Sequence, residues 1–439
     1  MKKIGLALIS FLLFQNILLA QEGQFEKLDS LFTILESNNR WMGSFSMSHD
    51  GTTVYEKSLG FADTENQQKA DNHTKYRVGS ITKIFTSTLT FMAIEEGLLP
   101  LDRTIETFFP EIENAGKITI GHLLSHRSGI FNFTSSEDYL EWHTEPKSRK
   151  ELVHLISEKE STFEPNSKAE YSNSNYILLT FILEDVFKTS YTDLVDTKIV
   201  QPLKLGRTQI GKHIKTSENE ALSYRFTDSW IEEKETDMSI PLGAGALIST
   251  PTDLNRFITA LFSEKLIGKE SLNTMKTISD GYGMGIFQMP FYDKKGYGHN
   301  GGIDGFTSML GYLPEDKLAF SLTSNGSRVN NNDIMVAALS AYFDKPFDLP
   351  SFKSFVVQPE ALALYVGTYS SEQTPLKITI TQSENGLMAQ ATGQPSFLLE
   401  AVEKDVFEFN QAGVRMEFEP SSKSMVLKQG GATYNYEIE

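Results

Sequence analysis

Ser80 and Lys83 are the two residues whose types and spacing most clearly suggest chemistry. They stand three positions apart, in a segment that opens a run of apolar residues with helical spacing. Residues three apart lie on one face of a helix, so the Lys83 amine can reach the Ser80 hydroxyl. Burial and the positive end of the helix dipole both disfavour an ammonium, so Lys83 can accept the serine proton. A helix N-cap followed by a solvated lysine is the alternative.

Two later segments carry further polar groups. Tyr171 and Asn173 precede a helical run over 176–186 and add a phenol and an amide at another helix start. The segment 297–306 is rich in glycine, which permits close approach of the backbone to a ligand, and it contains His299. The chain thus holds Ser-x-x-Lys, Tyr-x-Asn and His-x-Gly, in that order.

These three segments resemble the motifs of the serine β-lactamase and penicillin-binding superfamily. The branch they resemble contains class C β-lactamases, D,D-carboxypeptidases, D-aminopeptidases and related esterases. Segments 98–102, 118–129 and 245–254 are similar to other parts of that branch, so the resemblance covers most of residues 25–345. It is therefore more specific than any one motif.

The resemblance implies catalytic roles for three side chains. Ser80 would attack a carbonyl and form an acyl-enzyme, and Lys83 or the Tyr171 phenolate would take its proton. The resemblance leaves open which of the two is the base. The backbone N–H groups of Ser80 and Gly302 would form the oxyanion hole.

The resemblance also implies substrate-binding roles for Asn173, His299, Asn300 and Gly301. Many β-lactamases and carboxypeptidases have lysine where this chain has His299, and Thr or Ser where it has Asn300. Histidine is mostly neutral at pH 7, so it predicts a weaker and pH-dependent grip on a substrate carboxylate. The prediction argues against efficient β-lactam hydrolysis and leaves peptidase, amidase and esterase chemistry open.

The leading hypothesis is a serine hydrolase that acts through an acyl-enzyme. Its substrates would be D-amino-acid peptides, of the D-Ala-D-Ala carboxypeptidase or D-aminopeptidase type, or small amides and esters. The alternative is a penicillin-binding or muropeptide-sensing protein with negligible deacylation. A third hypothesis, an inert interaction protein, conflicts with the three intact motifs.

No metal or cofactor is predicted. His122 and His126 have the i, i+4 spacing of a metal-binding helix, but the sequence suggests no third ligand. The glycines at 281, 283 and 285 lack the strand, turn and helix of a dinucleotide site. The expected partner is a small-molecule or peptide substrate. The net charge of −17 argues against nucleic acid, and the sequence predicts no oligomeric state.

The N-terminus has the pattern of a secretory signal peptide. Lys2 and Lys3 precede an apolar stretch that ends at Ala20, which is short for a spanning helix. We expect cleavage after residue 20, no membrane span thereafter, and a periplasmic or secreted bacterial enzyme; an uncleaved anchor is the alternative. The chain has no cysteine, so it has neither disulfides nor a lipid-modified thiol.

The remaining chain divides near Pro350. Residues 21–350 mix helical and strand-like patterns and predict an α/β (α+β) fold, which the resemblance identifies as a two-lobed β-lactamase-like domain with an antiparallel sheet flanked by helices. Residues 351–439 hold short strand patterns separated by turns, including Asn385-Gly386 and Gly430-Gly431. They predict a small antiparallel β-barrel that resembles a lipocalin-like domain.

Overall fold

The computed structural model describes residues 24–227, 229–352, 355–394 and 396–439. The predicted signal peptide over 1–20 lies outside these residues. The described chain folds into two compact units. The sheet unit comprises residues 42–224 and 232–326, and the barrel unit comprises 24–41, 225–231 and 327–439. Among the described helices, none is both long and apolar enough to cross a membrane. The predicted domain boundary near residue 350 stays a prediction.

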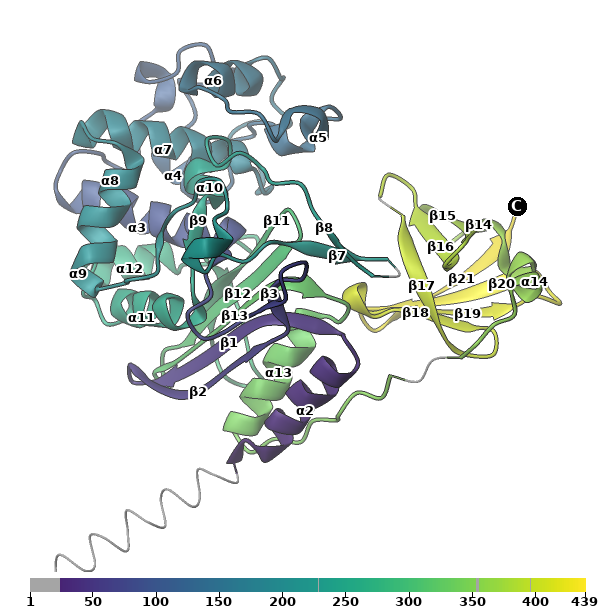
Figure 1. Cartoon of the computed structure of the whole chain (residues 1–439). Coiled ribbons are helices and arrows are strands. Elements are labelled where there is room, and N and C mark those ends of the chain that lie inside the picture. The colour runs from purple at the N-terminus through teal and green to yellow at the C-terminus, as the bar shows by residue number, and fades with distance from the viewer. Residues whose placement is uncertain (1–23, 228, 353–354, 395) are drawn as a thin grey trace, which may run out of the picture. The chain divides into compact units, whose positions relative to one another are not determined.

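A six-stranded antiparallel sheet is the centre of the sheet unit (Figure 1). Its order is β10-β11-β12-β13-β1-β2, so the first strand of the chain lies beside the last strand of the sheet. Its strands are β1 (Trp41–His49), β2 (Thr52–Leu59), β10 (Phe287–Gln288), β11 (Tyr297–Ile303), β12 (Phe306–Leu313) and β13 (Leu318–Ser327). Eight successive residues of β1 are buried, so this strand is covered on both faces.

Smaller strands complete the sheet unit. A three-stranded sheet joins β5 (Tyr76–Arg77), β9 (Leu247–Ser249) and β6 (Gln209–Ile210). β3 (Phe61–Asp63) pairs with β4 (Gln68–Lys69). β7 (Tyr224–Phe226) pairs with β8 (Trp230–Glu232), and most residues of these two strands belong to the barrel unit. β5 matters most for the site, because it ends three residues before Ser80.

The helices of the sheet unit gather beside the sheet (Figure 1). They are α3 (Thr82–Glu95), α4 (Ile120–Leu124), α5 (Tyr139–Trp142), α6 (Arg149–Ser157), α7 (Asn173–Phe187), α8 (Tyr191–Val195), α9 (Gln201–Leu203), α10 (Leu242–Gly245), α11 (Pro251–Phe262) and α12 (Lys269–Met275). α3 and α7 are buried on nearly all faces, pack against each other and contact α10. Both helices therefore lie in the core of this unit.

The barrel unit contains helices and a closed eight-stranded barrel. Helix α2 (Glu26–Ser37) contacts α13 (Asn331–Tyr342). The barrel comprises β14 (Gly367–Ser371), β15 (Thr374–Ser383), β16 (Gly386–Ala391), β17 (Phe397–Glu403), β18 (Val406–Phe409), β19 (Val414–Glu419), β20 (Ser424–Gln429) and β21 (Ala432–Ile438), preceded by the short helix α14 (Pro359–Leu362). The predicted α/β fold with a C-terminal barrel is confirmed.

Apolar side chains fill the barrel. Val414, Met416 and Phe418 alternate inward along β19 and pack with inward residues of the other strands, including Phe407 and Tyr436. Eight strands enclose a space that side chains of this size can fill. The interior of this barrel is therefore a packed core, as in a stabilising domain.

Within the barrel unit, Glu400 of β17 joins two arginines. Arg328 donates to one of its carboxylate oxygens at 2.6 Å and Arg40 donates to the other. The arginine side chains are only 16% and 10% exposed, and they stack on Phe226 and Phe352. Two nearly buried guanidinium groups therefore share one carboxylate.

Glu400→Gln should lower the free energy of unfolding by about 1–3 kcal/mol, because the amide removes the charge and points an N–H donor at an arginine donor. Glu403→Gln on the same strand is the matched control. Its carboxylate is 70% exposed and lies 3.7 Å from Arg415, so the change should cost less than about 0.5 kcal/mol. Urea unfolding of the full chain measures both, and equal midpoints would contradict the prediction.

Candidate active site

Ser80 lies at the junction of β5 and α3. The sequence predicted a helix start, and the structure has a single 3-10 turn, η1 (Gly79–Ile81), that runs directly into α3. Gly79 has a φ of +50°, and a Cβ there would lie 2.8 Å from the backbone nitrogen of Gly302. Only glycine meets both demands, so this glycine lets the serine turn approach β11 closely.

Lys83 lies one helical turn beyond Ser80, as the motif predicts. Its Nζ is 3.0 Å from Ser80 Oγ, 2.8 Å from Asn173 Oδ1 and 2.7 Å from the carbonyl oxygen of Ala244. The two carbonyl oxygens can only accept hydrogen bonds. A neutral amine has two N–H groups for them and keeps one lone pair, which faces the Ser80 hydroxyl. The geometry therefore fits a neutral lysine that accepts the serine proton.

Burial has the same effect on this lysine. The Lys83 side chain is completely buried, and none of its three hydrogen-bond partners is a carboxylate. Burial therefore holds the pKa of the Lys83 amine well below its usual value. The solvated lysine considered from the sequence is excluded.

Tyr171 reaches the same serine oxygen from the other motif. Its hydroxyl donates to Ser80 Oγ at 2.7 Å. Burial raises the pKa of Tyr171, and the hydrogen bond to Ser80 offsets this only in part. The phenol therefore keeps its proton and is placed to donate it, while the Lys83 lone pair is placed to accept one.

Asn173 is the first residue of α7 and holds the lysine in place. Its Oδ1 accepts from Lys83, and its Nδ2 donates to Thr134 Oγ1 at 2.9 Å. Its backbone N–H donates to Asn132 Oδ1 at 2.9 Å. Asn132 and Thr134 therefore fix the orientation of the amide. The structure thus joins the first two motifs at one serine.

The third motif lies on a strand, β11. Ile303 and Phe306 close its two-residue turn with β12, so they form a hydrogen-bonded pair. Such pairs alternate along an antiparallel ladder, which leaves the N–H of Gly302 directed away from β12. β10 pairs only with residues 297 and 298, so it does not cover this stretch of β11.

Gly302 instead faces the serine turn. Turn η1 contacts β11, and Gly79 lies against Gly302. A Cβ at Gly301 would lie 2.0 Å from the carbonyl oxygen of Val78, so glycine is required there as well. The N–H groups at the start of a helix lack partners within it. The Ser80 and Gly302 N–H groups can therefore serve one oxyanion.

His299 and Asn300 lie on opposite faces of β11. The Asn300 residue is exposed, whereas His299 is 3% exposed and packs on the rings of Phe287 and Tyr171 at 4.4 and 6.1 Å. Burial, followed by the nearby Lys83, lowers the pKa of His299 to about 3. The sequence predicts a histidine with an ordinary pKa. The predicted change of charge near neutral pH is therefore wrong, because burial keeps the ring neutral.

His126 supports Tyr171, a role that the sequence did not predict. Its Nδ1 accepts the backbone N–H of Ser172 at 3.2 Å, and its ring lies 4.5 Å from that of Tyr171. His122, its partner in the metal spacing, takes part in a capping box with Thr119. The two histidines therefore have separate structural tasks. The described residues contain no group of three side chains that could hold a metal.

Ala244, Asn132 and Thr134 also lacked a signal in the sequence. Ala244 acts through its backbone carbonyl oxygen. Every residue has such an oxygen, so the residue type gives no sign of this role. Asn132 and Thr134 lie about 40 positions before their partner Asn173. Only the packing of the chain brings these groups together.

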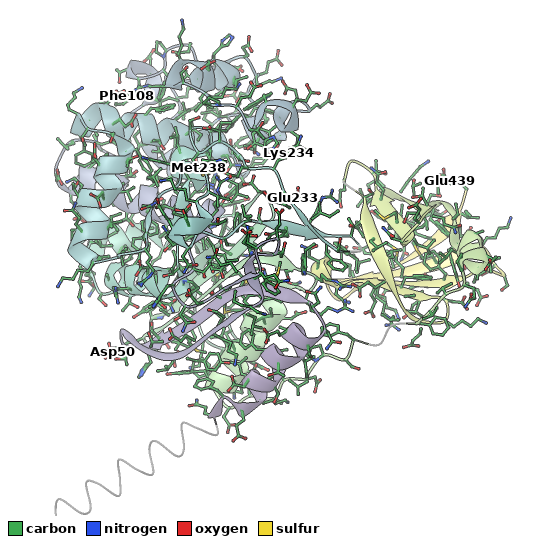
Figure 2. The ribbon with its side chains drawn as sticks, in the orientation of Figure 1. Asp50, Phe108, Glu233, Lys234, Met238 and Glu439 are labelled. Atoms are coloured by element: carbon green, nitrogen blue, oxygen red, sulfur yellow. The ribbon has the colours of Figure 1, made fainter. Side chains whose placement is uncertain are left out.

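A groove of about 800 Å³ lies elsewhere in the sheet unit. Phe108, Phe109, Arg149, Val153 and His154 are among its lining residues, and none of the predicted site residues lines it. Figure 2 labels Phe108 on the helical part and Met238 in the segment that leads to Ala244. The groove is therefore separate from the residues around Ser80.

Comparisons with known proteins show the family to which this chain belongs. The family model described as Beta-lactamase matches residues 38–342. Penicillin-binding protein 4* of Bacillus subtilis is 26% identical, over 92% of this chain and 96% of its own. The teichoic acid D-alanine hydrolase of Staphylococcus aureus is 24% identical, over 72% and 77%. A D-amino acid amidase structure from Ochrobactrum anthropi, complexed with D-phenylalanine, is similar with a TM-score of 0.64 and 25% identity, over 73% and 99%.

The family match covers more than half of the chain, and it includes all three motifs. The expectations of this superfamily and of a serine hydrolase are confirmed. The chain belongs to the beta-lactamase family, within the superfamily of serine β-lactamases and penicillin-binding proteins.

Proposed function

We propose that the protein hydrolyses amide or ester bonds on the carbonyl side of a D-amino acid through an acyl-enzyme on Ser80. The observation that carries this proposal is the position of Ser80 Oγ, 3.0 Å from Lys83 Nζ and 2.7 Å from the Tyr171 hydroxyl. The D-amino acid follows from the relatives, which include a D-amino acid amidase and a teichoic acid D-alanine hydrolase. The site residues and their roles are part of the proposal.

In acylation, Ser80 Oγ would bond to the substrate carbonyl carbon while its proton passes to the Lys83 amine. The Ser80 and Gly302 N–H groups would stabilise the negative charge that forms on the carbonyl oxygen. Tyr171 would donate its proton to the leaving nitrogen or oxygen, and the scissile bond would break. The proton on Lys83 would then pass to Tyr171. Lys83 is then neutral and Tyr171 protonated again before the second half-reaction begins.

Deacylation would follow the same path in reverse. A water molecule would replace the leaving group and lose a proton to Lys83 as its oxygen bonds to the acyl carbon. The Ser80 oxygen would leave and regain a proton, which releases the D-amino acid. Deacylation is the step that separates a hydrolase from a penicillin-binding or muropeptide-sensing protein.

The charge of the site favours substrates with a neutral leaving group. Lys83 has a lowered pKa, His299 stays neutral, and the exposed Asn300 carries no charge. These residues can therefore form hydrogen bonds with a substrate carboxylate, but they provide no positive charge to pair with it. We accordingly favour D-aminoacyl amides and esters over D,D-carboxypeptidase substrates and β-lactams.

Turnover of a substrate panel tests the proposal. The panel contains a D-alanine anilide, its L-enantiomer, a p-nitrophenyl ester and a chromogenic cephalosporin. We expect sustained turnover of the D-anilide and the ester, with the L-anilide and the cephalosporin much slower. A burst of one equivalent without steady turnover would support the penicillin-binding alternative instead.

The pH dependence should separate Lys83 from His299. Because Lys83 must be neutral to accept the serine proton, kcat/KM should fall as pH falls through its lowered pKa. His299, with a pKa of about 3, should add no change of charge above about pH 5. D-alanyl-D-alanine and its C-terminal amide are the matched substrates. The amide should be preferred, by a ratio that stays constant between about pH 5.5 and 7. A rise in kcat/KM for D-alanyl-D-alanine relative to kcat/KM for the amide as pH falls would contradict a neutral His299.

We further propose that the protein works in the bacterial envelope or outside the cell. The relatives named above include a penicillin-binding protein and a teichoic acid hydrolase, whose names refer to cell-wall chemistry. The N-terminal pattern of a signal peptide agrees with this location. Fractionation of cells that express the full chain, followed by N-terminal sequencing, tests both points.

A further inference from the structure

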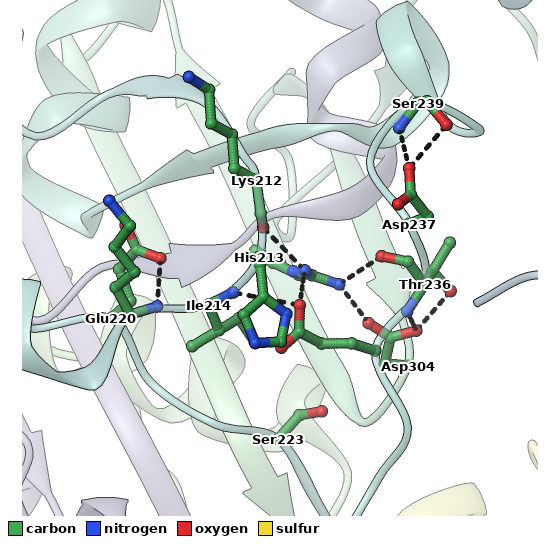
Figure 3. Close-up of polar contacts among 12 residues, drawn as sticks. Lys212, His213, Ile214, Glu220, Ser223, Thr236, Asp237, Ser239 and Asp304 are labelled. Carbon is green, nitrogen blue, oxygen red and sulfur yellow. Dashed lines mark hydrogen bonds and ion pairs between the residues drawn. The ribbon is translucent and has the colours of Figure 1, made fainter. Parts of the chain in front are cut away.

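Arg77 is a buried arginine with four directed hydrogen bonds. It ends β5, three residues before Ser80, and its side chain is 1% exposed. Its Nη1 donates to Asp304 Oδ2 at 2.8 Å and to the Thr236 carbonyl oxygen at 2.9 Å. Its Nη2 donates to Glu235 Oε2 at 2.6 Å and to the Lys212 carbonyl oxygen at 3.1 Å (Figure 3). A guanidinium held at four points has one orientation, so its backbone is held as well.

Asp304 completes this arrangement from β11. It follows the last residue of that strand and stands two residues after Gly302, and its side chain is 2% exposed. While Oδ2 accepts from Arg77, Oδ1 accepts from the Thr236 hydroxyl at 2.6 Å and from the Thr236 N–H at 3.1 Å (Figure 3). Both carboxylate oxygens are therefore used, and they connect β11 to the segment that contains Thr236.

The three connected segments each supply one part of the proposed site. The segment after Arg77 supplies the Ser80 oxygen and N–H, and the strand before Asp304 supplies the Gly302 N–H. The segment that begins at Thr236 continues to Ala244, whose carbonyl oxygen accepts a hydrogen bond from Lys83. The Arg77–Asp304 ion pair therefore connects the segments that carry the nucleophile, the oxyanion donors and the carbonyl oxygen that holds Lys83.

The contacts between these segments leave little room for independent movement. Gly79 and Gly301 pack so closely on Gly302 and Val78 that an added Cβ at either would clash with backbone. The Ser308 hydroxyl also donates to the Val78 carbonyl oxygen at 2.8 Å. A shift of Arg77 or Asp304 would therefore reach Ser80 and Gly302 through two or three residues of tightly packed backbone.

We infer that the Arg77–Asp304 ion pair sets the separation of the two oxyanion N–H donors, which makes Arg77 and Asp304 positioning residues for acyl transfer. The inference rests on the proposed acyl-enzyme at Ser80. A buried ion pair contributes little net stability compared with apolar residues of the same volume, so stability alone does not account for one at this place. Its directed hydrogen bonds instead determine a geometry, and an error of about 1 Å in such a site can cost about 10²-fold in rate.

Asp304→Asn tests the inference, because the amide puts an N–H donor where the carboxylate accepts from Arg77 or Thr236. We expect kcat to fall by about 10²-fold while KM changes by less than about 3-fold. The second readout is affinity for the boronic analogue of D-alanine, 1-aminoethylboronic acid. Ser80 Oγ would add to its boron as the serine proton passes to Lys83, and the anionic adduct places an oxygen in the oxyanion hole. This affinity should fall by about the same factor as kcat, whereas affinity for the product D-alanine should not.

Glu220→Gln is the matched control. Glu220 pairs with Lys75 at 3.1 Å, two residues before Arg77, and the two side chains are only 7% and 12% exposed. Figure 3 shows Glu220 in the same region, but it contacts neither Asp304 nor Thr236. This variant should lower the melting temperature and leave kcat and boronate affinity within about 2-fold of the parent.

The inference would be overturned if Asp304→Asn lowered the melting temperature, as Glu220→Gln should, but left kcat and the boronate affinity at the parent values. If Asp304→Asn does not fold, Thr236→Val takes its place, because it removes one hydrogen bond to Asp304 and keeps the ion pair. We expect about a 5-fold loss of kcat at unchanged KM, and parental kinetics would likewise overturn the inference. A parent protein that neither turns over D-alanine anilide nor binds the boronic acid would overturn the proposed function as well.

Discussion

Ser80→Ala is expected to abolish covalent labelling and to lower kcat by about 10⁴-fold or more. The change removes the oxygen atom that both Lys83 and Tyr171 approach, at 3.0 and 2.7 Å. The fold should remain, because alanine fits the 3-10 turn and creates no clash. Intact-protein mass spectrometry after treatment with a fluorophosphonate measures the labelling, and steady-state hydrolysis of the D-alanine anilide measures kcat.

Ser172→Ala is the control for this prediction. Ser172 is 3% exposed between Tyr171 and Asn173, and its hydroxyl has no hydrogen-bond partner among the described residues. Removal of that hydroxyl should leave labelling and kcat within about 2-fold of the parent. A Ser80→Ala protein that gains the acyl mass at the parental rate would show that the nucleophile is another residue.

Lys83→Met and Tyr171→Phe should each lower kcat/KM by about 10³-fold, and the double variant should be little slower than the slower single one. Both groups contact one oxygen, and the proton that Lys83 takes from Ser80 is the proton that must return through the pair. When either Lys83 or Tyr171 is missing, the proton cannot complete this path. Removal of the second residue should therefore lower kcat/KM little further. Methionine fits a lysine site that is completely buried, and phenylalanine keeps the ring that packs on His126.

A rapid-quench measurement of acylation, made with all three variants, checks the coupling. Losses that multiply in the double variant would mean that Lys83 and Tyr171 act independently. The single variants also separate their roles. Lys83→Met should slow acylation by esters and amides alike, whereas Tyr171→Phe should slow amides more, because an amine leaving group needs a proton and a nitrophenolate does not.

The sequence predicted the elements that depend on local pattern. Leu28, Leu31, Phe32 and Leu35 repeat at helical spacing, and α2 buries all four. The strands of the barrel follow alternating residues between turn signals, as the short strand patterns over 351–439 predicted. Strand β14 closes the barrel between β15 and β21. Closure depends on pairing between the two ends of the domain, which no local pattern records.

The motif residues were likewise visible in the sequence, because nucleophile, amine and phenol are properties of residue types. The charge states were not. An ordinary pKa was assumed for His299, whereas burial against Phe287 and Tyr171 lowers it to about 3. Burial is a property of packing, and the free energy of desolvating a charge is large enough to override the type of the residue.

The sequence by itself determined the family and predicted the nucleophile and the groups that approach it, because these depend on residue types at short spacings. Only the tertiary structure decided how those groups are held. The Ala244 carbonyl oxygen, the amide of Asn132 and the Arg77–Asp304 pair come from positions far apart in the chain, and the last two residues are separated by 227 positions. Hydrogen bonds over such separations form only after the core has brought the segments together, so they leave no periodic pattern and no motif spacing in the sequence.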